Sequence, residues 1–198
     1  MQQKNKKNSK SRGSPPGRLR IVAGKWRNRV LPVVDVPGLR PTAERIRETL
    51  FNWLAPTIDG ARCLDLFAGT GALGIEAMSR GAAAVEFVEN SRVAAQALRD
   101  SIEALEAPNA TVRQVDAVGY LGGEPTERFD VVFLDPPFAT DQSGELCRLL
   151  ASRGWLAKGG HVYLEQDSRQ RVPDLPDGWE MLKEKVTGKV RYSLIRSR

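Results

Sequence analysis

Residues 62–76 read Arg-Cys-Leu-Asp-Leu-Phe-Ala-Gly-Thr-Gly-Ala-Leu-Gly-Ile-Glu, and this stretch decides the fold. A short apolar run ends in Gly69, Gly71 and Gly74, after which a helical pattern begins. This order predicts a buried parallel strand, a glycine turn and the N-terminus of a helix. Glycine lets a ligand approach the backbone closely, and a helix start offers N–H groups that have no partner in the helix. The stretch therefore predicts a ligand-binding site.

The residues around the glycines indicate which ligand binds. The Gly69-x-Gly71-x-x-Gly74 spacing, with Glu89 at the end of the next predicted strand, matches a dinucleotide fingerprint. Asp65 argues against a dinucleotide, because a carboxylate at the strand end repels a pyrophosphate. It suits a cationic group instead. S-adenosylmethionine has an ammonium group, a sulfonium and a ribose diol that Glu89 could hold. The Asp-x-Phe-x-Gly-x-Gly pattern resembles motif I of the class I methyltransferases.

Composition sets outer bounds on the protein. The chain has 198 residues, 41% hydrophobic and 27% charged, which is ordinary for a globular protein. No apolar run approaches the ~20 residues of a membrane span, so we expect a cytoplasmic protein with no membrane partner. Cys63 and Cys147 lie in apolar patterns and are expected to be reduced core residues. With His161 as the sole histidine, we predict no metal site.

Positive charge is concentrated at the N-terminus. Residues 1–34 contain ten basic and no acidic residues, whereas the whole chain has a net charge of +6. This distribution is typical of a protein that binds a polyanion, although a tail that only aids solubility would have the same composition. We predict a disordered basic tail (1–17), an RNA-binding extension (18–56) and a class I methyltransferase catalytic domain (57–198).

The predicted extension begins with two short strands around residues 19–22 and 30–34. The turn between them presents Trp26 among basic residues, where its ring could stack on a base. A helix follows, with Thr42 as the expected N-cap. The candidate RNA-binding residues, including two in the C-terminal hairpin, are Arg20, Lys25, Trp26, Arg27, Arg40, Arg45, Arg47, Lys189 and Arg191.

From residue 62 onward, strand and helix patterns alternate. Strands are predicted at 62–67, 85–89, 110–115, 129–134 and 161–165, helices at 71–80, 91–105 and 142–152, and a hairpin at 179–187 and 190–196. Alternation of this kind predicts an α/β protein with a doubly wound, mostly parallel sheet, closed by an antiparallel hairpin.

Carboxylates follow two of these strands. Glu89 could accept hydrogen bonds from the ribose hydroxyls, and Asp116 from the adenine amino group, because ligands bind at the carboxyl ends of such strands. Either could instead be the N-cap of the helix that follows it. The candidate cofactor-binding residues are Asp65, Phe67, Gly69, Gly71, Glu89, Asn90, Asp116 and Ala117.

The candidate catalytic residues are Asp135, Pro136, Pro137 and Phe138, directly after an apolar strand. The Asp135 carboxylate and the Pro136 carbonyl could each accept one hydrogen of an exocyclic amino group, while Phe138 stacks on the base. Two acceptors would aim the nitrogen lone pair at the methyl group, so positioning could supply most of the acceleration. Asp135 could also accept the released proton as a general base.

These residues resemble known enzymes. The Asp135–Phe138 tetrad resembles the motif of adenine-N6, cytosine-N4 and guanine-N2 methyltransferases, so it does not choose the base. Residues 20–26, 40–54 and 64–71 are similar to the bacterial small-subunit rRNA guanine-N2 methyltransferase family, with a mild departure at Ala43-Glu44.

The resemblance runs from about Arg20 to the terminal hairpin. It implies a Rossmann-like seven-stranded methyltransferase sheet with helices on both faces and a small N-terminal β/helix extension. It also implies S-adenosylmethionine as donor and one guanine of 16S rRNA as target, in a small-subunit particle or an assembly intermediate. We expect a monomer.

Other functions stay open at this point. A DNA or RNA adenine-N6 or cytosine-N4 methyltransferase would carry the same tetrad, but the chain leaves little room for a separate target-recognition domain. A NAD-dependent oxidoreductase is disfavoured by Asp65, and a non-catalytic RNA-binding protein by the intact tetrad. We expect His161 to be structural, and Glu165 to be a carboxylate at the site rim or an ion-pair partner.

Overall fold

The computed structural model describes residues 17–34, 36, 42–140 and 142–198. Candidate residue Arg40 and the tail up to residue 16 lie outside this part of the chain. The strands and helices are, in order, β1 (Gly17–Arg20), β2 (Val30–Val33), α1 (Glu44–Trp53), β3 (Arg62–Asp65), α2 (Ala72–Ser79), β4 (Ala84–Val88), α3 (Arg92–Ala104), β5 (Ala110–Arg113), α4 (Ala117–Gly122), β6 (Phe129–Leu134), α5 (Ser143–Ser152), β7 (Leu156–Asp167), β8 (Glu180–Thr187) and β9 (Val190–Arg196).

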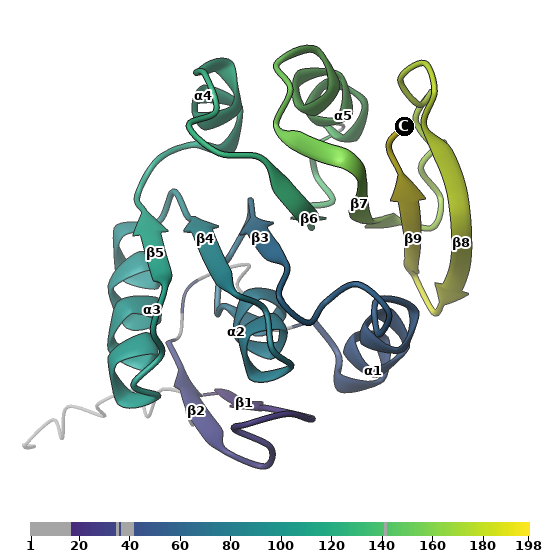
Figure 1. Cartoon of the computed structure of the whole chain (residues 1–198). Helices are drawn as coiled ribbons and strands as arrows, with labels where there is room; N and C mark the ends of the chain where they lie inside the picture. The colour runs from purple at the N-terminus through teal and green to yellow at the C-terminus, as the bar shows by residue number, and fades with distance from the viewer. Residues whose placement is uncertain (1–16, 35, 37–41, 141) are drawn as a thin grey trace, which may run out of the picture.

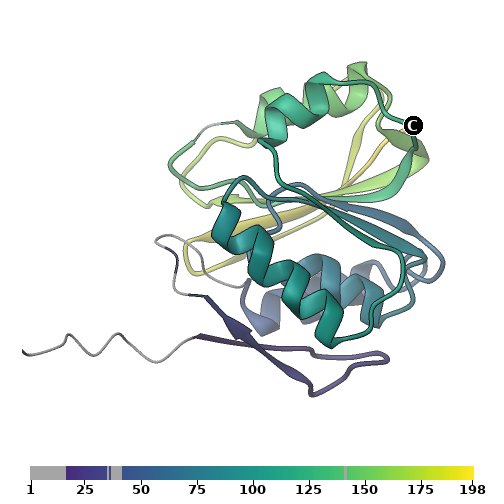
Figure 2. The ribbon, with the colours of Figure 1, turned by 90° about the vertical axis from the view of Figure 1, so that its left-hand side faces the viewer.

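Seven strands form one sheet in the order β5-β4-β3-β6-β7-β9-β8. The first five are parallel, and β9 runs antiparallel to both β7 and β8. Helices α4 and α5 cover one face and α1, α2 and α3 the other, and the layers are visible from two sides (Figures 1 and 2). The predicted fold, including the seven-stranded sheet and the C-terminal hairpin, is confirmed.

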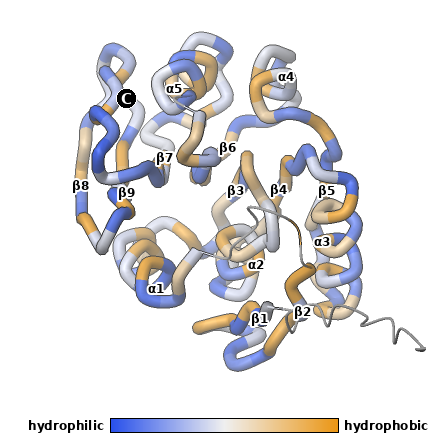
Figure 3. Tube along the Cα trace, turned by 180° about the vertical axis from the view of Figure 1, so that it is seen from behind, coloured by the Kyte–Doolittle hydropathy of each residue, from blue (hydrophilic) through white to orange (hydrophobic). Residues whose placement is uncertain are grey.

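Alternation along the buried strands builds a core on each face of the sheet. Cys63 and Phe133 belong to the core under α1 and α2, whereas their neighbours Leu64 and Val132 belong to the core under α4 and α5. Hydrophobic positions accordingly mark the central strands β3 and β4 in Figure 3. Both cysteines are buried and free, as expected.

Strands β1 and β2 form a separate antiparallel ribbon on the outer side of α2 and α3 (Figures 1 and 2). Its residues Leu19, Ile21, Leu31 and Val33 belong to the same core as α2. Helix α2 is therefore enclosed between the sheet and the ribbon, and all eight of its residues are buried.

Three local expectations were wrong. Helix α1 begins at Glu44 with Ala43 as its N-cap, so Thr42 does not cap it. Helix α4 has no counterpart among the predicted ranges, although a helix capped by Asp116 was an alternative; Gly119 and Gly122 interrupt its helical pattern. Strand β7 begins at Leu156 rather than at residue 161, with a register irregularity opposite β6. Among the described residues, no helix is long and apolar enough to span a membrane.

Candidate active site

The five parallel strands carry carboxylates at or near their carboxyl ends, one for each strand apart from Asp167, the last residue of β7, which pairs with Arg169. In the order of the strands across the sheet from β5 to β7, these are Asp116, Glu89, Asp65, Asp135 and Glu165. The carboxyl edge of an open α/β sheet is where such folds bind ligands. The structure thus brings most of the predicted donor and catalytic residues to one edge, and it adds Glu165 to them.

The glycine loop turns the chain from β3 into α2. Gly69 and Gly71 have φ angles of 52° and 76°, which favour glycine, and Gly71 is the N-cap of α2. A Cβ at Gly74 would lie 2.1 Å from the Phe87 ring, so this glycine allows α2 to pack closely on β4. Phe67, before the loop, is partly buried against the core under α4 and α5.

Glu89 ties the glycine loop to the start of α3. Its Oε2 accepts a hydrogen bond from the Gly69 N–H (2.8 Å), and its Oε1 accepts one from the Ser91 N–H (2.7 Å). Each carboxylate oxygen has a second lone pair, so these bonds leave acceptor capacity for a ligand hydroxyl. The next residue, Asn90, is exposed.

Asp65 is buried, with 2% of its surface exposed, and its Oδ2 accepts a hydrogen bond from the Gly74 N–H (3.0 Å). Burial raises the pKa of Asp65 to about 7, and the charges of Asp135 and Glu89 act in the same direction. The Gly74 N–H stabilises the ionised form in part, but no cation of the described residues pairs with it. A cationic group bound beside it would compensate its charge.

Asp116 has a structural role that the sequence left as an alternative. Its side chain accepts a hydrogen bond from the Gly119 N–H (2.9 Å) as the N-cap of α4, while the residue itself stays exposed. Ala117, the first residue of the helix, is buried. Contact of Asp116 with adenine stays a prediction.

The tetrad Asp135–Phe138 is held from two sides. On one side, the Thr42 hydroxyl lies 3.4 Å from Asp135 Oδ2. On the other, the Gln170 side chain donates to the Phe138 carbonyl (3.0 Å). Pro136 is buried, whereas Pro137 and the Phe138 ring, which is 37% exposed, face outward. Burial raises the pKa of Asp135 to about 6.

Glu165 lies close to Asp135, because the parallel strands β6 and β7 pair up to Leu134 and Leu164, and the two carboxylates are the residues that follow. It is 6% exposed, and its Oε2 accepts a hydrogen bond from the Tyr163 hydroxyl (2.6 Å). Burial and the Asp135 charge raise the pKa of Glu165. Among the described residues it forms no ion pair, so the ion-pair alternative was wrong, and a role at the site stays a prediction.

Two predicted RNA-binding residues are buried, and these predictions were wrong. Trp26 is 5% exposed and belongs to the core that contains α2, so its ring does not face a base; its backbone N–H donates to the Ser79 side chain (3.0 Å). Arg47 is 2% exposed and donates to Glu76 (3.2 Å) and to the Arg20 carbonyl (2.8 Å). Its spacing from Leu50, Phe51 and Leu54 puts it on the apolar face of α1, which was the missed signal.

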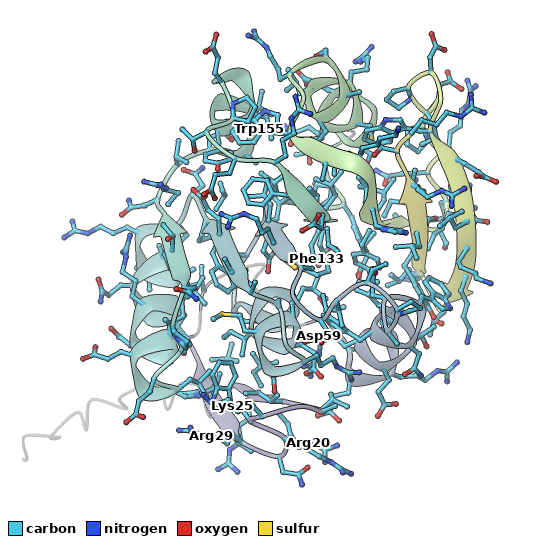
Figure 4. The ribbon with its side chains drawn as sticks, in the orientation of Figure 1. Arg20, Lys25, Arg29, Asp59, Phe133 and Trp155 are labelled. Carbon is cyan, nitrogen blue, oxygen red and sulfur yellow. The ribbon has the colours of Figure 1, made fainter. Side chains whose placement is uncertain are left out.

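The basic turn between β1 and β2 lies at the far ends of α2 and α3. The Lys25 N–H donates to the Ser79 carbonyl (2.6 Å), and the Arg29 guanidinium to the Ala104 carbonyl (2.8 Å). Figure 4 shows Arg20, Lys25 and Arg29 on the ribbon. Since the glycine loop is at the N-terminus of α2, the turn is separated from it by the length of that helix, about 12 Å at 1.5 Å per residue.

The other candidates for RNA contact differ in whether their side chains are exposed or bonded within the protein. Lys25, Arg27, Arg45 and Lys189 are exposed, and Arg20 pairs with Glu44 on the surface. Arg191 is partly buried and donates to the Gln170 carbonyl (2.8 Å), the same residue that holds the Phe138 carbonyl. Arg191 therefore supports the tetrad loop.

The chain resembles known proteins over most of its length. The model of the family described as "Conserved hypothetical protein 95" matches residues 19–196. "Ribosomal RNA small subunit methyltransferase D" of Escherichia coli is 46% identical over 181 residues, 91% of each chain. The protein of the same name from Haemophilus influenzae is 41% identical over 184 residues, 91% of this chain and 95% of the relative.

Solved structures agree with this. A putative methyltransferase of Escherichia coli superposes with a TM-score of 0.86 at 42% identity and covers 91% of this chain and 98% of its own. A putative methylase of Haemophilus influenzae gives a TM-score of 0.80 at 38% identity, covering 91% and 99%. The predicted methyltransferase is thereby confirmed, and the chain belongs to the family of these small-subunit ribosomal RNA methyltransferases.

Proposed function

We propose that the protein transfers the methyl group of S-adenosylmethionine to the exocyclic N2 amino group of one guanine in 16S rRNA. The observation that carries the proposal is the position of Asp135–Phe138 at the end of β6, next in the sheet to Asp65 at the end of β3. A donor pocket and a base pocket on neighbouring strands let the methyl group pass between them. The names of the 46% and 41% identical relatives support rRNA as the substrate.

On the donor side, Asp65 receives the ammonium group and Glu89 the ribose hydroxyls, while Gly69 and Gly71 let the donor lie close to the backbone. The buried, uncompensated carboxyl of Asp65 suits a cation and disfavours the pyrophosphate of NAD.

On the acceptor side, the Asp135 carboxylate and the Pro136 carbonyl accept the two amino hydrogens, and the exposed Phe138 ring stacks on the base. The nitrogen then attacks the methyl carbon, the sulfur–carbon bond breaks, and the amine gives up a proton, for which Asp135 is the nearest acceptor. Asp135 must be ionised for this, and its pKa of about 6 makes it so at neutral pH. The target lies in a small-subunit particle or an assembly intermediate in the cytoplasm, and the enzyme acts as a monomer.

Methyl transfer to small-subunit particles and to naked 16S rRNA, both from a strain that lacks the enzyme, tests the proposal. We expect incorporation from methyl-labelled S-adenosylmethionine at one guanine, located by mass spectrometry. Asp135→Ala should lower the rate by about 10²-fold or more, because it removes a positioning and proton-accepting group. Its donor affinity, measured by calorimetry, should change less than about threefold.

Glu124→Ala, which alters an exposed carboxylate away from the site, is the matched control and should leave the rate unchanged. Methylation of an adenine or a cytosine would replace this proposal by the amino-methyltransferase alternative. If Asp135→Ala lowered donor affinity in parallel with the rate, Asp135 would belong to the donor pocket instead.

A further inference from the structure

We propose that Glu165 makes the site selective for guanine by accepting a hydrogen bond from the N1–H of the target base. This inference rests on the function proposed above and assigns a specificity-determining residue to it.

The sheet places Glu165 next to the carboxylate that receives the amino group. Strands β6 and β7 are parallel and pair Phe133 with Tyr163 and Leu134 with Leu164, and Asp135 and Glu165 directly follow this last pair. Neighbouring strands lie about 4.8 Å apart, and side chains at equivalent positions share a face. The two carboxyl groups therefore stand side by side, on the face to which Phe133 and Tyr163 contribute their rings.

One carboxylate oxygen of Glu165 is hydrogen-bonded within the protein, and the other is available to a ligand. The Tyr163 hydroxyl fixes Oε2 at 2.6 Å, and among the described residues Oε1 has no hydrogen-bond partner. No lysine or arginine of this part of the chain forms an ion pair with Glu165. A buried carboxyl group without a cation destabilises a fold, and such groups gather where a ligand satisfies them.

Guanine matches two adjacent acceptors, and the other amino-bearing bases do not. Its N1–H and its N2 amino group are neighbouring donors. In adenine and cytosine, the ring nitrogen beside the amino group is an acceptor, so the same carboxylate would face a lone pair. With Asp135 accepting from the amino group, Glu165 can accept from N1–H. The positive charge of the bound sulfonium favours the ionised form of Glu165.

The test replaces the target guanine, once mapped, by 2-aminopurine in the RNA. This base keeps the amino group but has an acceptor at N1. We expect the wild-type enzyme to prefer guanine by about 10- to 100-fold in kcat/KM, the range of one hydrogen bond to a charged group. Glu165→Leu should lower kcat/KM for the guanine substrate by a similar factor. It should change kcat/KM for the 2-aminopurine substrate by less than about threefold. Glu165→Gln, whose amide can turn its N–H₂ toward N1, should raise the value for 2-aminopurine.

Glu124→Gln, which alters an exposed carboxylate away from the site, is the control and should change kcat/KM for neither substrate. Equal loss on both substrates in Glu165→Leu, or no preference in the wild type, would overturn the inference. If Glu165→Leu does not fold, Glu165→Gln decides: an unchanged preference for guanine counts against the inference and a narrowed one supports it. A wild type that methylates no guanine at all would instead defeat the proposed function.

Discussion

Two buried carboxylates on the same side of the sheet, Glu76 in α2 and Asp65 in β3, have opposite surroundings. Glu76 is fully buried and accepts four hydrogen bonds, from the backbone N–H groups of Val22 and Ala23 (2.9 and 3.0 Å) and from the guanidinium groups of Arg47 and Arg80 (3.2 and 2.8 Å). Asp65 is almost as deeply buried but accepts a single hydrogen bond, from the backbone of Gly74.

The difference separates a structural carboxylate from a ligand-binding one. The partners of Glu76 come from the β1–β2 ribbon, from α1 and from α2 itself, so its charge fastens the ribbon to the catalytic fold. Asp65 has no cation among its hydrogen-bond partners in the described part of the chain, and burial raises its pKa to about 7. A buried charge that the chain compensates stabilises the fold, and one that it leaves uncompensated is available to a cation.

The largest effect is expected at Glu76. Glu76→Ala leaves Arg47 buried without its counter-ion and two ribbon N–H groups without an acceptor. We expect the unfolding free energy to fall by about 3–5 kcal/mol, the range for breaking one side of a buried ion pair. In a protein of this size the melting temperature should fall by about 10 °C.

Glu44→Ala is the matched control, because it breaks the surface ion pair with Arg20. Exposed pairs of this kind contribute less than about 1 kcal/mol. Similar melting temperatures for the two variants would show that Glu76 does not hold the ribbon on the catalytic fold. The contrast between a structural Glu76 and a ligand-binding Asp65 would then be wrong.

An intermediate effect, of opposite sign for stability, is expected at Asp65. Asp65→Asn keeps the shape and an acceptor for the Gly74 N–H but removes the charge. Donor affinity should fall by about 10- to 100-fold, since a hydrogen bond to a charged group is removed. The donor-free protein should gain at least about 1 kcal/mol at pH 8, seen as a rise of roughly 2–4 °C in melting temperature.

The gain must follow pH. The pKa of Asp65 lies near 3.8 in the unfolded chain and about 7 in the folded one. Below pH 4 Asp65 is protonated in both the folded and the unfolded wild type. Asp65→Asn should therefore have the same melting temperature as the wild type. Between pH 4 and 7 the folded wild type holds a proton that the unfolded chain has released, so its stability falls as pH rises. Above pH 7 the difference in stability between Asp65→Asn and the wild type should stay constant. A variant less stable than the wild type at pH 8 would contradict an uncompensated Asp65.

The smallest effect is expected on the ribbon's outer surface. Lys25→Gln with Arg27→Gln removes two exposed cations but leaves the buried side chains of Trp26 and Glu76 in place. If the turn binds phosphates, the slope of log affinity for 16S rRNA against log salt should flatten by about 0.7 for each phosphate that is no longer neutralised. Donor affinity should not change.

Arg45→Gln is the counterpart at the site end of α1, near Thr42. A flatter slope for Arg45→Gln and an unchanged one for the ribbon variant would place RNA recognition at the carboxyl edge, and the ribbon would then be purely structural.

The sequence sufficed for the parts of the molecule that local patterns encode. The glycine loop, the alternating strands and the strand-end carboxylates depend on neighbours in the chain, and all were predicted. Burial of Trp26 and Arg47 depends on Ser79 and Glu76, 53 and 29 residues away. Neither partner could be inferred from a turn rich in basic residues or from the composition of one helix.

In the candidate site, too, contacts between residues far apart in the sequence could not be predicted. Asp135 was predicted because the Asp-Pro-Pro-Phe motif is contiguous. The position of Glu165 near Asp135 could not be read from the sequence, because it depends on the pairing of β6 with β7, which are joined by a connection that holds a helix. Similarly, Thr42 resembled a helix cap, but its hydroxyl faces Asp135.

The fastening of the ribbon by α2 also bears on how the chain is made. Ribosomes synthesise the ribbon before α2, because Glu76 and Ser79, to which it is hydrogen-bonded, follow 53 to 56 residues later. At about 5–20 residues per second, the apolar side of the ribbon waits several seconds for its partner. The sheet that supports α2 is completed only with β9, near the C-terminus. The ribbon is therefore translated well before the helix on which it packs, and until that helix forms, the ribbon's charged residues keep it in solution.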